Sequence, residues 1–162
     1  MGRRVRHRPR CSDAGNRRGA RRRASPRPRG RLSFPDVIDA AIAVGDLDAA
    51  DRLADIFADH PKGAIPQFLR AQVAHARALV ASARGNYAGM ATGLVAAETA
   101  LGALGYRVWV ARAQLDRAKW LARQGRLGES AQIAERAAAG FAYVGAAPML
   151  GRARQLSETA FR

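Results

Sequence analysis

The side chains that could do chemistry are few, and their spacing fits no catalytic or metal-binding motif. The three histidines, His7, His60 and His75, are far apart in the chain, and Cys11 is the single cysteine. The sequence contains no G-x-x-x-x-G-K phosphate loop, no G-x-S-x-G nucleophile elbow and no H-E-x-x-H pair. We therefore expect a non-enzymatic protein with no catalytic residues, no metal site and no cofactor. His60 precedes Pro61 at an expected helix end, where an imidazole interacts favourably with the helix dipole.

A row of aspartates has two interpretations. The row consists of Asp46, Asp48, Asp51, Asp55 and Asp59. Asp48, Asp51 and Asp55 would share one face of a helix, which could indicate a cation site. Hard cations usually need more converging oxygens than one helix face provides, and acidic residues in a first turn complement the helix N-terminus. We favour a solvated acidic face.

Residues 1–32 carry most of the positive charge. They contain 13 Arg against the single acidic residue Asp13, a net charge of +12, whereas residues 33–162 hold 15 basic and 12 acidic residues. Because the segment lacks apolar periodicity and cannot bury enough surface to offset chain entropy, we expect a disordered arm. Three interpretations stay open: a tail that binds nucleic-acid phosphates, a mitochondrial-type leader without the usual apolar face, or a translation start assigned too early.

The rest of the composition favours a cytoplasmic protein. Cys11 has no second cysteine with which to form an internal disulfide, and no secretory signal is present. The apolar stretch 87–104 is long enough to suggest a membrane span, but it contains Glu98 and three glycines. An ionised carboxylate inside the bilayer costs about 2.5 to 3.5 kcal/mol on insertion scales, so we expect no membrane insertion.

Helical periodicity begins at Ser33, which can cap a helix that has Pro35 in its first turn. Apolar residues at helical spacing then predict a series of helices. The predicted ranges are 33–44, 47–60, 67–84, 87–104, 108–124, 127–144 and 148–161.

The turns repeat every 40 residues. Gly45, Gly85 and Gly125 separate the two helices of each pair, and Gly105 and Gly145 end the second helices. Matching positions include the apolar series Leu47, Tyr87, Leu127 and Ala54, Leu94, Ala134, and the pair Arg112 and Arg152. Two helices per 40 residues predict an all-α fold, an α-solenoid of about three helix-turn-helix units and a terminal capping helix in residues 33–162. Gly89 and Gly93 either permit close helix packing or reflect a GC-rich genome.

The segments "GDLDAA", "VARAQLDRA" and "LARQGRLGESAQIAERAAAGFAYVGA" resemble tetratricopeptide-type repeats in a longer, 40-residue form. Such repeats are similar to the C-terminal arrays of bacterial LuxR-type ATPase regulators and class III nucleotide cyclases. Met90 and Ser130 depart from the small residue that Ala50 supplies at the turn. The resemblance implies an interaction module of a bacterial signalling or transcription-regulatory system, either autonomous or detached from a larger regulator. The alternative function is nucleic-acid binding through residues 1–32.

Tetratricopeptide-type arrays bind a partner along the surface of each unit's first helix. In this chain the resemblance assigns six residues to that surface: Gln72, His75, Ser82, Arg112, Lys119 and Arg123. An acidic peptide would suit this basic and polar stripe. The other interpretation is that Asp116 forms exposed helix pairs with Arg112 and Lys119. We expect Trp109 and Trp120 to pack between units, and an exposed apolar end of the last helix would favour self-association.

Overall fold

The computed structural model describes residues 34–58, 60–61 and 63–159. The chain divides into two units, Met1–Arg31 and Leu32–Arg162, and all described residues belong to the second. The predicted disorder of residues 1–32 and the proposed cap at Ser33 therefore lie outside the described residues.

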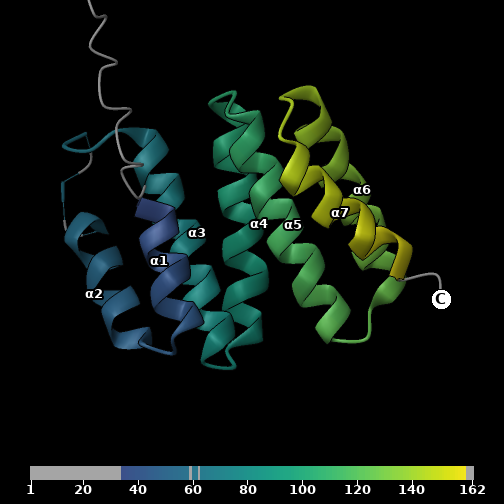
Figure 1. Cartoon of the computed structure of the whole chain (residues 1–162). Coiled ribbons are helices and arrows are strands. Elements are labelled where there is room, and N and C mark those ends of the chain that lie inside the picture. Colours follow the sequence, from purple (N-terminus) through teal and green to yellow (C-terminus); the bar gives the residue numbers. More distant parts are fainter. Residues whose placement is uncertain (1–33, 59, 62, 160–162) are drawn as a thin grey trace, which may run out of the picture. The chain divides into compact units, whose positions relative to one another are not determined.

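Every regular element among the described residues is an α-helix, which confirms the all-α class (Figure 1). The seven helices are α1 (Phe34–Ala43), α2 (Leu47–Ala58), α3 (Gln67–Ala83), α4 (Tyr87–Ala103), α5 (Arg107–Arg123), α6 (Leu127–Tyr143) and α7 (Ala147–Thr159). The helices thus follow the predicted ranges, with every end within two residues.

Glycine makes the predicted turns. Gly45, Gly85 and Gly125 have φ angles of 81°, 80° and 74°, in the left-handed region that glycine adopts without a steric penalty. The residue after each glycine donates its N–H to the carbonyl five residues earlier, as from Asn86 to Ala81 at 2.8 Å. This pattern closes a helix with the Schellman arrangement. The same bond recurs after Gly105 and Gly145, so helix ends in both halves of the repeat use one geometry.

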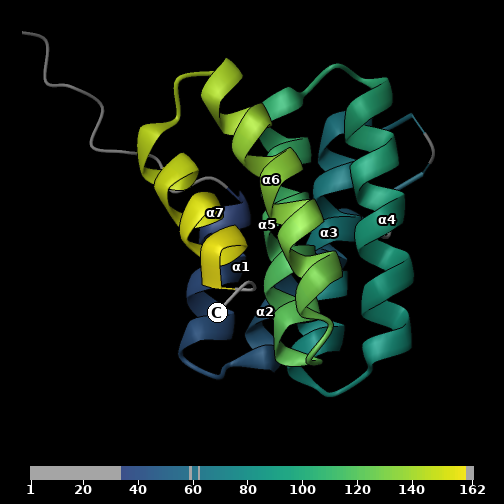
Figure 2. The same ribbon diagram turned by 90° about the vertical axis from the view of Figure 1, so that its right-hand side faces the viewer.

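The helices pack mainly against their neighbours in the chain. Each packs against the next, and α1 also packs against α3 and α5 against α7. In a view turned by 90°, α1 and α7 lie toward one side and α4 toward the other (Figure 2). Ala54, Leu94 and Ala134, which are 40 residues apart, are all fully buried, as the shared apolar face predicts.

The series Leu47, Tyr87 and Leu127 departs from this pattern. Leu47 is partly buried, but Tyr87 and Leu127 are 48% and 44% exposed. Each of the three is the first residue of its helix, at an end where fewer neighbouring side chains are available to cover it. Helical spacing on an apolar face therefore does not bury Tyr87 and Leu127 at these helix ends.

Glycine also permits close packing between α3 and α4, but at only one of the two proposed positions. A Cβ atom on Gly93 would come 2.8 Å from the Cβ of Ala78 on α3, closer than real Cβ atoms approach. A Cβ atom on Gly89 would instead meet the side chain of Asn86, which accepts a hydrogen bond from the Gly89 N–H. Close helix packing therefore explains Gly93 and not Gly89.

The predicted packing residues on α5 lie in apolar surroundings. Trp120 is 7% exposed and belongs to a cluster with residues of α3, α4 and α6. Trp109 is partly buried, and its ring contacts that of Phe68 on α3, with centroids 5.8 Å apart. Both tryptophans thus join neighbouring helices, as predicted.

None of the described helices combines the length and the apolar character that a membrane span requires. The stretch 87–104 forms the whole of α4 and the residue after it. Its Glu98 accepts a hydrogen bond from Gln114 and lies 3.6 Å from a guanidinium nitrogen of Arg117. The carboxylate is therefore used in packing α4 against α5.

Candidate partner-binding groove

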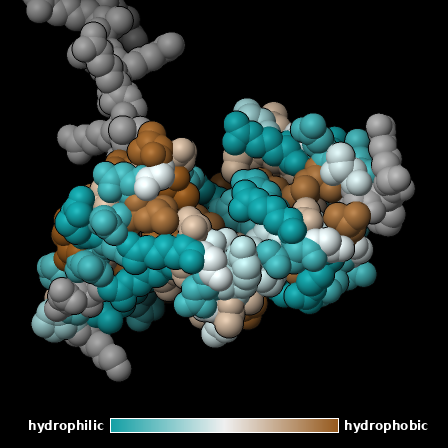
Figure 3. Space-filling view, turned by 90° about the horizontal axis from the view of Figure 1, so that it is seen from below, coloured by the Kyte–Doolittle hydropathy of each residue, from teal (hydrophilic) through white to brown (hydrophobic). Residues whose placement is uncertain are grey.

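Two adjoining hollows form a groove on the face that α1, α3, α5 and α7 line. The first has a volume of about 370 Å³ and lies between α1, α3 and α5, with Met90 of α4 at its edge. The second, of about 300 Å³, lies between α5 and α7. Lys119 lines both, so we treat them as one groove. Seen from below, the described surface is hollowed and hydrophilic residues cover much of the hollow (Figure 3).

The charged residues of the groove are mostly basic. Lys119, Arg123 and Arg152 line it together with the acidic residues Asp39 and Asp116. Both carboxylates are already paired, Asp39 with Arg112 and Asp116 with His75 and Lys119. Arg123 and Arg152 form no ion pair with any described residue. The groove therefore offers unpaired positive charge, which favours a carboxylate-bearing ligand.

A charged cluster lies at the groove floor, where α3 meets α5. Nε2 of His75 is 3.2 Å from Oδ2 of Asp116, and Nζ of Lys119 donates to Oδ1 of Asp116 at 2.8 Å. The imidazole contact does not have the alignment of a regular hydrogen bond. Burial alone would raise the pKa of Asp116, but the adjacent His75 and the charge of Lys119 hold that pKa below its ordinary value of 3.8.

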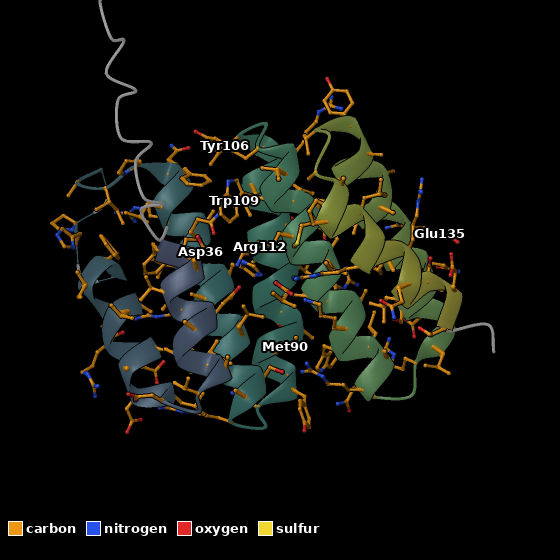
Figure 4. The ribbon with its side chains drawn as sticks, viewed as in Figure 1. Asp36, Met90, Tyr106, Trp109, Arg112 and Glu135 are labelled. Atoms are coloured by element: carbon orange, nitrogen blue, oxygen red, sulfur yellow. The ribbon has the colours of Figure 1, made fainter. Side chains whose placement is uncertain are left out.

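Arg112 joins two helices that are far apart in the sequence. Its guanidinium contacts Asp39 and lies 3.4 Å from Asp36, both on α1. The same guanidinium lies 5.3 Å from the ring centroid of Trp109 (Figure 4). Because the side chain is only 17% exposed, these contacts are screened less than surface pairs. The expected local pair with Asp116 does not form, since Arg112 turns to α1 instead.

The six residues predicted to contact a partner separate into two groups. Ser82, Lys119 and Arg123 line the groove. Arg112 is occupied by α1, whereas Gln72 and His75 are 1% and 2% exposed. Residues of α1 cover both positions, together with a small gap that holds no water-sized volume. A partner could reach the first group directly but could not touch Gln72 or His75.

Gln72 is buried without compensation. Neither its Nε2 nor its Oε1 has a hydrogen-bond partner among the described residues. A buried, unpaired amide costs about 1 to 3 kcal/mol. The spacing on α3 predicts that Gln72 lies on the accessible stripe. In the structure, residues of α1 cover it.

The sequence-based stripe omitted two groove residues that turn out to be central. Asp39 lies on α1, a helix to which the predicted stripe assigns no residue. Arg152 was recognised as the equivalent of Arg112 but was not assigned a role. The 40-residue register alone could have placed Arg152 on the stripe.

The row of aspartates serves packing and capping. Asp48 and Asp51 pair with Arg84, and Asp55 pairs with Arg77. Oδ1 of Asp46 accepts the N–H of Ala49 at 2.9 Å, which caps α2. Asp59 lies outside the described residues. Over the described ranges, no group of three or more His, Cys, Asp or Glu side chains is arranged to hold a metal ion. Because Asp48 and Asp55 remain more than half exposed, the row forms the predicted solvated face and also pairs with arginines.

His60 is exposed two residues beyond the end of α2. The carbonyl of the next residue, Pro61, accepts a hydrogen bond of 2.5 Å from Arg70 of α3. Arg70 therefore holds the segment between α2 and α3 by its backbone, and the imidazole of His60 takes no part in this contact.

No protein-family model, curated protein or solved structure matches this chain.

Proposed function

We propose that residues 33–162 form a tetratricopeptide-like α-solenoid that acts as a non-enzymatic protein-protein interaction module. The repeated glycine turns and the equivalent buried residues 40 positions apart support the repeat. The contacts between successive helices are those that stacked helical hairpins require. In this proposal α7 is the capping helix of the array.

The proposed ligand is an acidic segment of another protein, bound in the groove. The observation that carries this proposal is the unpaired Arg123 in a groove whose two carboxylates are already paired. A segment that carries carboxylates would gain charge-assisted hydrogen bonds there without displacing an existing pair. The wider assignment, to a bacterial signalling or transcription-regulatory system, depends on the resemblance of the repeats alone.

A peptide-binding experiment tests this function. The full chain is titrated into a fluorescein-labelled dodecamer of glutamate at physiological salt, and binding is followed by fluorescence anisotropy. The double variant Lys119→Gln/Arg123→Gln should weaken binding by about tenfold or more, because each lost charge-assisted contact contributes about 1 kcal/mol. The control Arg136→Gln/Arg154→Gln removes the same charge outside the groove and should bind as the wild type does. Equal loss in both variants would show nonspecific attraction and contradict the proposal.

The alternative function, nucleic-acid binding, is supported by the net charge of +12 in residues 1–32. Neutralising DNA phosphates would make affinity fall steeply with salt. Comparing DNA binding by the full chain and by residues 33–162 at several salt concentrations tests it. Steep salt dependence that is lost with residues 1–32 would favour the nucleic-acid function.

A further inference from the structure

Arg112 and Arg152 are equivalent in position, and each contacts the side chain three residues earlier. They are 40 residues apart, and each precedes a buried alanine, Ala113 or Ala153. Arg112 extends over Trp109, three residues earlier, and Nη1 of Arg152 lies 4.0 Å from the sulfur of Met149, also three residues earlier. Each guanidinium group therefore lies over the preceding turn of its own helix.

Arg112 shows what this position binds. Its guanidinium holds two carboxylates, from Asp36 and Asp39, which are three residues apart and share one face of α1. The contacts come from a segment more than 70 residues away in the sequence. Two carboxylates of α1 thus occupy the first of the two equivalent arginines.

Arg152 is at the equivalent position on α7 but has no counterpart of the two carboxylates that α1 presents to Arg112. The residues that follow Asp36 and Asp39 by 40 are Ala76 and Leu79 of α3, which carry no charge. Arg152 makes no ion pair with any described residue, and it lines the hollow of about 300 Å³ between α5 and α7. The lining of that hollow contains Lys119 but no acidic residue.

The geometry points to Arg152 as a carboxylate-binding subsite that takes an acidic helical segment of a partner protein. The segment would present two carboxylates three residues apart, as α1 does, toward Arg152 and Lys119. An aliphatic side chain beside them would contact Leu156, which lines the same hollow and is partly exposed. This inference rests on the proposed function and adds the chemistry of the ligand and the residue that selects it.

The test uses a peptide with the sequence of α1, FPDVIDAAIA, labelled with fluorescein, and a matched peptide in which both aspartates are asparagine. Each is titrated with the full chain and followed by anisotropy. The acidic peptide should bind more tightly than the amide peptide by about threefold to tenfold. Arg152→Gln should abolish that preference. Arg154→Gln, an equal loss of charge from an exposed position on the same helix, should retain it.

The outcomes separate this inference from the proposed function. If Arg152→Gln and Arg154→Gln keep the same preference, or if the wild type binds both peptides equally, the subsite is wrong. A third outcome is that Lys119→Gln/Arg123→Gln no longer binds the glutamate peptide while Arg152→Gln still prefers the acidic peptide. That result would support the proposed groove and contradict the Arg152 subsite. Circular dichroism and thermal unfolding confirm that each variant is folded. A photo-crosslinking group at the end of the acidic peptide should label α5 or α7, and labelling confined to other helices would also overturn the subsite.

Discussion

His75 of α3 and Asp116 of α5 approach to 3.2 Å beneath α1, where the imidazole is almost completely buried. Other charged groups around the pair are Lys119 on α5 and, in the adjoining linings, Asp39 of α1 and Arg123. The pair links the first helices of two successive hairpins. Its charge state should therefore influence how firmly the two hairpins hold together.

Asp116 should make the stability depend on pH in the acid range. Its pKa is lower in the folded chain than the ordinary value of 3.8, so the unfolded chain binds the proton more readily. The stabilisation is then fully present above about pH 4 to 5 and is lost as the pH falls through the folded pKa. Asp116→Asn should lower the free energy of unfolding at pH 7 by about 1 to 3 kcal/mol. Urea unfolding measures this difference.

The pH dependence provides the control for Asp116. The difference between Asp116→Asn and the wild type should shrink toward the lowest pH at which both chains still fold. The variant Glu135→Gln, at an exposed position that makes no ion pair with described residues, should follow the wild type throughout (Figure 4). A constant difference from pH 7 to pH 3 would show that the loss comes from packing and not from the charge.

Gln72→Met should stabilise the chain. Methionine has nearly the same length and shape but carries no amide, so the cost of burying Nε2 and Oε1 without partners disappears. We expect the free energy of unfolding to rise by about 1 to 2 kcal/mol. The comparison is Gln155→Met on α7, which is exposed and should change stability little. Destabilisation by Gln72→Met would mean that the amide has a partner.

Gly93→Ala should destabilise the chain although alanine is the better helix former. Its Cβ would come 2.8 Å from that of Ala78, and overpacking of this kind costs about 1 to 3 kcal/mol. Gly151→Ala is the matched control, because no atom lies within 4 Å of its Cβ and the gain in helix propensity of up to about 1 kcal/mol should appear alone. Thermal unfolding compares the two. If both substitutions stabilise equally, α3 and α4 are not closely packed at Gly93.

Arg112→Gln should loosen α1 locally. The substitution removes the contacts to Asp36 and Asp39 while α3 to α7 keep their own packing. Amide hydrogen exchange of α1 should become about fivefold to thirtyfold faster, corresponding to about 1 to 2 kcal/mol of lost local stability. Exchange in α6 should not change. The control Arg117→Gln, which removes a longer contact to Glu98, should leave α1 as it is. Uniform acceleration in all helices would indicate global destabilisation instead.

The local structure could be predicted from the sequence because its causes are local. The apolar spacing of each helix and the glycine that ends it lie within a few residues of each other, and Gly45, Gly85 and Gly125 repeat the same turn. The 40-residue interval likewise identified equivalent buried residues such as Ala54, Leu94 and Ala134. The charge pair of Asp116 with Lys119 could also be predicted from the sequence, because the two residues lie one helical turn apart.

The composition of the groove depended on contacts between helices that are distant in the chain. Helical spacing assigned Gln72 and His75 to an accessible stripe, but α1 covers them. The same spacing paired Arg112 with Asp116, whereas Arg112 reaches α1 and leaves Asp116 to His75. Periodicity defines which residues share a face of one helix. Which other helix covers that face is decided by packing, and only the tertiary structure shows it.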